Sequence, residues 1–285
     1  MRISGRPFTE LMSFSFKSIG APSAALIRFP DFRVVLAFWP LAVENSPISQ
    51  SLVRFLLGGF MGQARRIVIP GIPHHVVLHG VRSIDIFASD ADRRYYVGTL
   101  NECAGRYGLS IWVWCLMTNH IHLVVVPADE LSLGKGIGET HRRYSRHFNF
   151  SQSASGHLFK ERYFSYPIQQ DGNLLCVARY VELNPVMAGM VPRPDAYAWS
   201  SARHHLRGKA DPLVGRSALL DMAPNWKEFL ADGISLHRDR EMIERHLSTG
   251  RPLGSPAWIA GLESKTGRRL APRRVRRRKA ALELR

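Results

Sequence analysis

From residue 74 onward, apolar residues fall into short runs that alternate between strand and helix patterns. Four runs have the length and composition of strands, and they span residues 74–81, 109–117, 120–126 and 159–168. Three longer stretches are helix candidates, and they span residues 91–107, 131–150 and 172–184. Because only Thr118 and Asn119 separate the second strand from the third, we expect these two strands to form a hairpin.

The order of these elements predicts the fold class. Strand, helix, strand, strand, helix, strand and helix favour an α+β fold with a ferredoxin-like split β-α-β core, an antiparallel sheet and helices on one face. Residues 213–249 look helical, and one more short helix is expected after residues 252–256. We therefore expect a core domain at 61–207, a helical C-terminal region at 208–262 and a basic disordered tail at 263–285.

Residues 1–60 follow a different pattern. Nine of these sixty residues are charged, against 22% of the whole chain, and apolar residues, Pro, Gly and Ser alternate without a sustained period. Met61 is then followed by a short basic segment and the next predicted strand, which is the pattern expected of a protein's N-terminus. Two interpretations stay open: a poorly ordered extension, or a mis-assigned start with Met61 as the biological first residue.

The positive net charge indicates that the protein binds nucleic acid. The chain of 285 residues has a formal net charge of +16 and a sequence pI near 10.5, which is typical of proteins that meet a polyanion. Residues 268–279 carry eight positive charges and no negative one. Such a block repels itself and is expected to stay disordered until it meets phosphate, although a tail that only aids solubility is the alternative.

Cysteine spacing and hydropathy exclude other classes of protein. Cys103, Cys115 and Cys176 have no short paired spacing, so they predict neither a zinc knuckle nor a disulfide framework, and they indicate a reduced, intracellular chain. No apolar run reaches the length that a membrane span needs. We expect no membrane partner.

The candidate chemistry lies in two places. His120 and His122 stand two residues apart in a predicted strand, so their imidazoles share one face and could hold a divalent cation. Tyr180 and Asn184 stand four residues apart in a predicted helix, again on one face. A metal-binding histidine pair with a helical tyrosine suggests a nuclease that attacks phosphodiesters through a phenolic oxygen.

Each signal also has an ordinary structural explanation. A His-x-His pair is more often packed or solvent-facing than metal-binding, and a tyrosine at helical spacing is usually half-buried packing. Asn184 precedes Pro185, so it could instead be the N-cap of a segment that opens with proline. Only the combination of signals is specific.

Several motifs occur together in a fixed order over roughly residues 65–207. They are Met117–Val124, Gly156–Phe159, Ala178–Val186 and Tyr197–Ser201, with Gly250–Ser255 and the basic tail beyond them. In these motifs the chain resembles the single-tyrosine HUH transposases, and in particular the REP-associated tyrosine transposase (RAYT) group. Two positions depart from that pattern: Asn184 stands where small insertion-sequence enzymes have Gln, and His79 stands where Arg is expected.

The resemblance implies a metal-dependent single-tyrosine DNA endonuclease and strand transferase. Its expected partner is single-stranded DNA with palindromic hairpins, its cofactor Mg²⁺ or Mn²⁺, and its location the prokaryotic cytoplasm at the nucleoid, with a homodimer as one expected assembly. By position, Tyr180 matches the nucleophile, His120 and His122 the metal ligands, and Asn184 a third, amide-type ligand. Attack by Tyr180 would leave a 5′-phosphotyrosine and a free 3′-hydroxyl, so a second 3′-hydroxyl could reverse the step without ATP.

Substrate contacts are predicted from charge and aromaticity. The candidate phosphate-binding residues are Lys135, Arg142, Arg143, Arg146, Lys160, Arg162, Arg273, Arg274, Arg276 and Arg277. Tyr163, Phe164 and Tyr166 are the candidates for stacking on unpaired bases. Two rival functions remain: a non-catalytic regulator that binds hairpin DNA or RNA on the same fold, and a hydrolase whose histidine pair activates water.

Overall fold

The computed structural model describes residues 66–160, 162–215, 219–231 and 236–272 (backbone only for 236–238), together with two short strands nearer the N-terminus. The chain divides into two compact units, Met1–Ala64 and Arg65–Arg285. In the first unit the description covers β1 (Arg28–Phe29) and β2 (Phe32–Arg33), which pair antiparallel. The rest of residues 1–60 lies outside the described residues, so both interpretations of this segment stay open.

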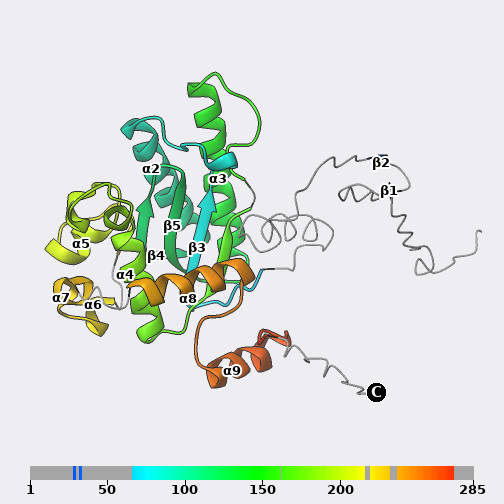
Figure 1. The fold of residues 1–285 in the computed structure, drawn as a ribbon, viewed down its shortest axis with the longest axis vertical. Helices are drawn as coiled ribbons and strands as arrows, with labels where there is room; N and C mark the ends of the chain where they lie inside the picture. The colour runs from blue at the N-terminus through cyan, green and yellow to red at the C-terminus, as the bar shows by residue number, and fades with distance from the viewer. Residues whose placement is uncertain are drawn as a thin grey trace, which may run out of the picture. The chain divides into compact units, whose positions relative to one another are not determined.

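The centre of the second unit is one antiparallel sheet of four strands in the order β4-β5-β3-β6 (Figure 1). The strands are β3 (His74–His79), β4 (Leu109–Leu116), β5 (His120–Pro127) and β6 (Phe164–Pro167). β4 and β5 form the expected hairpin, and β3 pairs with both β5 and β6. This topology is the ferredoxin-like split β-α-β core that the sequence predicted.

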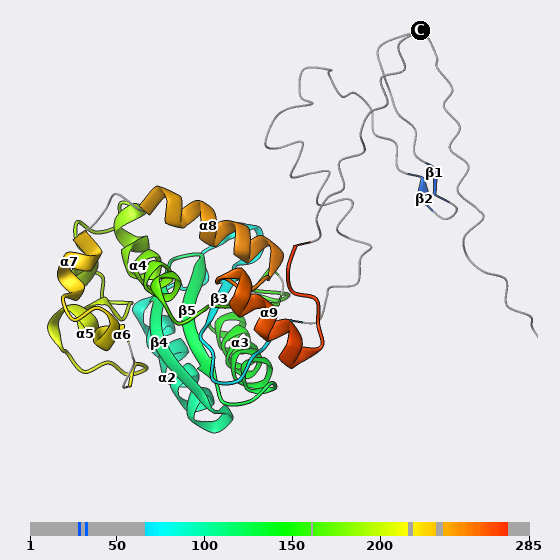
Figure 2. The same cartoon turned by 90° about the horizontal axis from the view of Figure 1, so that it is seen from below.

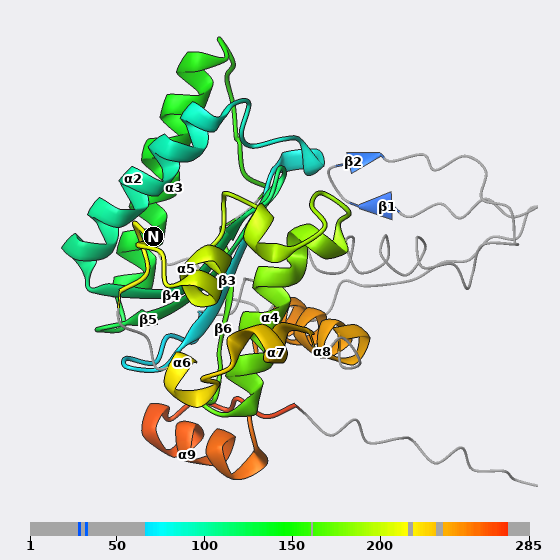
Figure 3. The same cartoon turned by 90° about the vertical axis from the view of Figure 1, so that its left-hand side faces the viewer.

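The helices cover both faces of the sheet, so the expectation that they lie on one face was wrong. α2 (Asp90–Tyr107) and α3 (Ser132–Ser151) pack on one face, and α4 (Gly172–Met187) with α8 (Leu236–Thr249) packs on the other (Figures 2 and 3). The physical reason is that the strands are apolar on both sides. In β5, Ile121 and Leu123 bury against α2 and α3, whereas Val124 buries against α4. Both faces must be covered to keep these residues from water.

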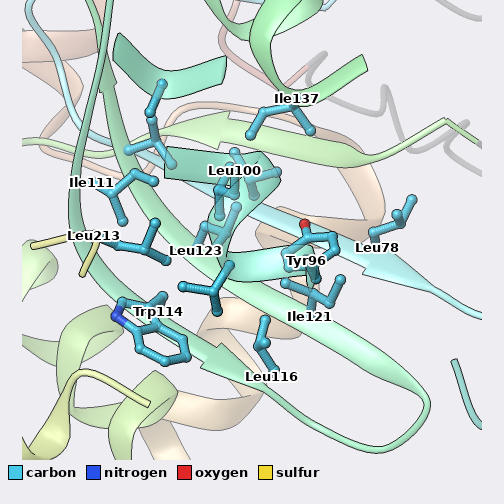
Figure 4. Close-up of a cluster of buried hydrophobic side chains, with 14 of the residues drawn as sticks. Leu78, Tyr96, Leu100, Ile111, Trp114, Leu116, Ile121, Leu123, Ile137 and Leu213 are labelled. Carbon is cyan, nitrogen blue, oxygen red and sulfur yellow. The ribbon is translucent and has the colours of Figure 1, made fainter. Parts of the chain in front are cut away.

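A register shift in β4 helps both faces to fill. Side chains alternate across a strand, yet Ile111 and Val113 face opposite sides because the pairing with β5 shifts between them. One extra residue at this bulge exchanges the faces of everything after it. Trp114 and Leu116 therefore join Ile111 in the cluster beside α2 and α3 (Figure 4).

The helix ends follow from local chemistry. Ser89 accepts from the backbone N–H of Asp92 while Asp92 accepts from that of Ser89, which is a capping box at the start of α2. Gly108 ends α2 at φ 65°, a left-handed conformation that suits glycine. α4 begins at the Asp171 cap and continues through Pro185 to Met187. Asn184 is therefore an interior residue of α4, and its alternative interpretation as an N-cap was wrong.

The C-terminal region is more divided than the sequence pattern indicated. The segment 213–249 contains α6 (Leu219–Met222), α7 (Trp226–Ala231) and α8, and not one continuous helix. The short turn η3 (Pro194–Ala196) and α5 (Ala202–Arg207) precede them, and η2 (Val81–Ser83) follows β3. α9 (Pro256–Thr266) is the expected short helix after residues 252–256.

Part of the predicted basic tail is folded. α9 includes residues 263–266, and Leu270 is buried against Ile69 and Leu262. The Glu263 carboxylate accepts from the backbone N–H groups of Leu270 and Ala271 at 2.6 and 2.8 Å. The domain limit at 207 stays a prediction, and residues 273–285 lie outside the described residues. Among the described helices, none is both long and apolar enough to cross a membrane.

Candidate active site

The fold brings together the four residues that the sequence selected for chemistry. His120 and His122 project from β5 towards α4, and Tyr180 and Asn184 lie one turn apart on α4. The ring centroids of His122 and Tyr180 are 5.5 Å apart and those of His120 and His122 are 4.8 Å apart. The Asn184 amide Nδ2 lies 3.2 Å from His122 Nε2.

A buried polar network fixes the rotation of α4 about its axis. Glu182, with no exposed surface, accepts from Ser201 Oγ at 2.7 Å, from Trp226 Nε1 at 2.8 Å and from His205 Nδ1 at 2.5 Å. Because Glu182 is two residues beyond Tyr180, it lies on the opposite side of the helix. Holding Glu182 among α5, α7 and the Ser201 loop therefore turns Tyr180 and Asn184 towards the histidines.

These residues open into a cavity of about 530 Å³. Its sheet wall consists of Val77, His79, His120 and His122, and Phe164 of β6 adjoins them. Its α4 wall consists of Tyr180, Asn184, Met187 and Ala188. Its third wall is α8, through Arg240, Glu244, Leu247 and Ser248. The predicted nucleophile and the predicted metal ligands therefore share one solvent-filled space.

Hydrogen bonds orient both imidazoles of the pair. His120 Nδ1 lies 2.7 Å from Asn119 Oδ1, so Nδ1–H donates and Nε2 is left unprotonated. His122 Nδ1 lies 3.1 Å from His75 Nε2, and His75 Nδ1 lies 3.1 Å from Tyr166 Oη. Because the Asn184 amide Nδ2 donates to His122 Nε2, His122 has the same tautomer, with its Nδ1–H directed to His75. Outer partners of this kind commonly fix the orientation of metal-binding histidines.

Burial keeps these histidines neutral. Desolvation, with the neighbouring His79, lowers the pKa of His120 to about 4, and desolvation with three nearby histidines places the pKa of His122 well below its usual value. Desolvation also lowers the pKa of His75 to about 3. A neutral imidazole is the form that binds a cation, so both members of the pair are ready to act as ligands at neutral pH.

Tyr180 is protonated at neutral pH. Burial raises the pKa of its phenol, and the Glu244 carboxylate raises it further, against an opposing effect of the Asn184 side chain. A phenol in this state is a weak nucleophile unless its target is polarised or its proton is removed. A reaction at Tyr180 would therefore depend on such help from the groups around it.

The donor set fits a divalent metal ion. Within the described part of the chain, no three His, Cys, Asp or Glu side chains form a metal-binding group. The converging atoms are instead two imidazole Nε2 atoms and one carboxamide, which presents its oxygen after a half-turn of the amide. Two nitrogens and one amide oxygen leave positions for water and other oxygen ligands, so these side chains could hold a divalent cation.

Those predicted phosphate-binding residues that the structure describes do not line this cavity. Those on α3 are on the opposite face of the sheet from Tyr180, and they are Lys135, Arg142, Arg143 and Arg146. Arg142 pairs with Glu139 at 2.7 Å and Arg143 with Glu102 at 2.8 Å. These α3 residues cannot touch a ligand in the cavity beside Tyr180, so any DNA contact they make is at another part of the molecule.

The other predicted contacts are closer to the cavity or undescribed. Lys160 and Arg162 are exposed ahead of β6, and the Lys160 backbone N–H donates to the His79 carbonyl at 2.9 Å, which puts Lys160 at the cavity rim. Arg273, Arg274, Arg276 and Arg277 lie outside the described residues. Of the three stacking candidates, Tyr163 and Tyr166 are buried, and Phe164, at 39% exposure, can meet a base.

Sequence reasoning missed two groups of residues at the site. The first is His75 and His79, which share a face of β3 with Val77 and touch the rings of His122 and His120. The available signal was that His75 and His79 stand an even number of residues apart in a predicted strand, so that their side chains share one face. The second is Arg240 and Glu244 on α8, for which no sequence signal existed because α8 is joined to the site only by tertiary packing.

Comparisons with known proteins found one family model and similar solved structures. Residues 70–184 match the family model described as IS200-like transposase. Two solved structures are similar in fold: a REP-associated tyrosine transposase bound to a REP hairpin, and a putative transposase from Deinococcus radiodurans. The first has 16% identity and a TM-score of 0.43 and covers 55% of this chain and 93% of its own. The second has 11% identity and a TM-score of 0.30 and covers 46% of this chain and 98% of its own.

No curated protein matches the chain. The family match extends from just before β3 to the last turn of α4, and it therefore includes His120, His122, Tyr180 and Asn184. It confirms the resemblance to single-tyrosine transposases that the motifs indicated. Residues 70–184 of this chain are therefore similar to the IS200-like transposase family.

Proposed function

We propose that this protein cleaves and rejoins single-stranded DNA through a covalent bond to Tyr180. The observation that carries the proposal is the shared cavity, in which the Tyr180 ring lies 5.5 Å from the His122 ring and Asn184 lies 3.2 Å from His122 Nε2. A tyrosine that was only packing would not need two oriented, neutral imidazoles beside it. The transposase family of residues 70–184 supports the same reaction class.

The reaction is a phosphoryl transfer with the chain as nucleophile. Tyr180 Oη forms a bond to phosphorus, the bond from phosphorus to the 3′-oxygen breaks, and the phenolic proton is balanced by the proton that the leaving 3′-hydroxyl gains. The products are a 5′-phosphotyrosine and a free 3′-hydroxyl, and attack by another 3′-hydroxyl reverses the step. His120, His122 and Asn184 would hold Mg²⁺ or Mn²⁺, which supplies Lewis-acid stabilisation of charge at the phosphate.

The substrate we propose is single-stranded DNA that contains a palindromic hairpin. The support is the motif pattern shared with REP-associated tyrosine transposases, together with the family of residues 70–184. A net charge of +16 suits a polyanionic partner. A homodimer remains part of this proposal as one assembly in which the reaction could occur.

The test is a search for a covalent protein–DNA adduct. Purified protein is incubated with end-labelled hairpin DNA and Mn²⁺ and then run on a denaturing gel. We expect an adduct with the wild type and none with Tyr180→Phe or with His120→Ala/His122→Ala. Tyr95→Phe is the matched control, because Tyr95 is a half-exposed tyrosine on α2, on the far face of the sheet.

Two results would contradict the proposal. Cleavage that survives in Tyr180→Phe would favour a hydrolase in which the histidine pair activates water. Tight binding of several hairpins with neither cleavage nor adduct would favour a non-catalytic regulator.

A further inference from the structure

We infer that Arg240 on α8 binds the phosphate that Tyr180 attacks, so that this C-terminal helix completes the reaction site; the inference rests on the proposed function. α8 lies beyond residues 70–184, so the family match assigns it no role. The structure nevertheless makes it one wall of the cavity that holds Tyr180, His120 and His122. In Figure 2, α8 lies beside α4 on the same side of the sheet.

A buried ion pair aligns α8 with α4. Arg179 Nη2 donates to Asp239 Oδ2 at 2.5 Å, and the two side chains are only 4% and 8% exposed. Arg179 directly precedes Tyr180, and Asp239 directly precedes Arg240. The ion pair therefore sets which residues of the two helices are neighbours, and it brings Arg240 to the cavity that Tyr180 enters.

The far end of α8 is also held in place. His246 Nδ1 donates to the Arg251 carbonyl at 3.0 Å, and the Leu253 backbone N–H donates to the Pro167 carbonyl at 2.9 Å. Leu253 pairs in parallel with Ile168, just after β6. Because both ends are attached to the core, α8 presents its side chains to the cavity in a fixed position.

Arg240 is oriented and still able to bind an anion. Its Nε–H donates to Glu244 Oε1 at 2.7 Å, one helical turn further along α8. This bond uses one of the five donors of the guanidinium, so both terminal nitrogens can bind another acceptor. The side chain is 61% exposed. Its charge is close enough to Tyr180 to oppose the rise that burial and Glu244 cause in the pKa of that phenol.

Arg240 is the fixed positive charge within the cavity lining, whereas Lys160 stands at the rim. Of the side chains that line the cavity, all within the described residues, Arg240 is the only Arg or Lys. A guanidinium offers paired N–H groups that match two phosphate oxygens, and it stays charged throughout the accessible pH range. Such a donor stabilises the charge that builds up at phosphorus during attack.

The test compares Arg240→Ala, Arg240→Lys and Arg245→Ala in the full chain. Arg245 is the matched control, because it is an exposed arginine of α8 that does not line the cavity. With hairpin DNA, we expect Arg240→Ala to slow single-turnover adduct formation by about 10- to 100-fold, the value of one hydrogen bond to a charged group. Arg240→Lys should recover part of the rate, and Arg245→Ala should match the wild type.

Binding measurements locate the contact on the DNA. In Arg240→Ala, the slope of log Kd against log salt should fall by about 0.7, the value of one phosphate contact on a single strand. A DNA with an uncharged methylphosphonate at the reacting position should bind the wild type and Arg240→Ala equally.

Three results would overturn the inference about Arg240. The first is an Arg240→Ala variant with wild-type rate and salt slope. The second is an Arg240→Ala defect that persists with methylphosphonate DNA, which would place the contact at another phosphate. The third is an equal defect in Arg245→Ala, which would mean a general effect of charge. If the wild type forms no adduct, the proposed function fails instead, and the salt slope still decides whether Arg240 touches phosphate.

Discussion

A substitution of His75 tests whether the site depends on the orientation of the His122 imidazole, because His75 contacts His122 without lining the cavity. His75 has no exposed surface, and its two nitrogens bridge His122 Nδ1 and Tyr166 Oη at 3.1 Å each. The perturbation is His75→Leu, which keeps a side chain of similar size and removes both hydrogen bonds. His122 keeps its place on β5 but loses the partner that fixes its tautomer and ring orientation.

The expected losses of metal affinity and of folding stability depend on how many hydrogen bonds are lost and how deeply they are buried. Removing a hydrogen-bond partner of a metal-binding histidine commonly costs about 10- to 100-fold in metal affinity, or about 1.4 to 2.8 kcal/mol. Leaving His122 Nδ1 and Tyr166 Oη without partners should also lower the free energy of unfolding by about 1 to 3 kcal/mol for each buried group. We therefore expect both a less stable protein and a higher metal requirement.

The assay is single-turnover adduct formation with hairpin DNA over a series of Mn²⁺ concentrations, at a temperature where all variants are folded. The half-maximal Mn²⁺ concentration should rise by about 10- to 100-fold in His75→Leu. His74→Leu is the control. His74 is equally buried, accepts from Ile69 N at 3.1 Å and donates to the Ile72 carbonyl at 2.7 Å, but it faces the other side of the sheet.

The reasoning is refuted if His75→Leu has the wild-type Mn²⁺ requirement. It is also refuted if His74→Leu raises that requirement as much, because the effect would then report lost stability and not the orientation of His122.

Two further predictions concern stability. Asp239→Ala removes the buried carboxylate that pairs with Arg179, so the free energy of unfolding measured with urea should fall by about 3 to 5 kcal/mol. A loss below about 1 kcal/mol would show that α8 is not held by this pair. Burial lowers the pKa of His74 to about 4 and that of His75 to about 3, from 6.5. As the pH falls below about 6.5, only the unfolded chain takes up these protons. The free energy of unfolding is therefore at its full value above that pH, and it drops by about 1.4 kcal/mol per pH unit for each histidine down to about pH 4. His74→Leu should remove one proton from this slope in denaturation measured at several pH values, and an unchanged slope would contradict the assignment.

Local patterns in the sequence were enough to predict the strands and the candidate site residues. Strand length, the Thr118–Asn119 turn and helix spacing depend on neighbours along the chain, so the hairpin and the three core helices could be found without a structure. The same periodicity placed His120 with His122 and Tyr180 with Asn184 on shared faces. The motif order then indicated the family that residues 70–184 match.

The tertiary structure decided which faces meet. Apolar residues on both sides of β5 do not determine which helix covers which side of the sheet. In the structure, α4 covers the face opposite to α2 and α3. That choice brings Tyr180 to the histidines and takes Arg142 of α3 away from them. Arg240 reaches the cavity only because Arg179 and Asp239, sixty residues apart, pair in the core. Contacts between distant segments depend on the summed packing of many side chains, and no local pattern in a single sequence contains that information.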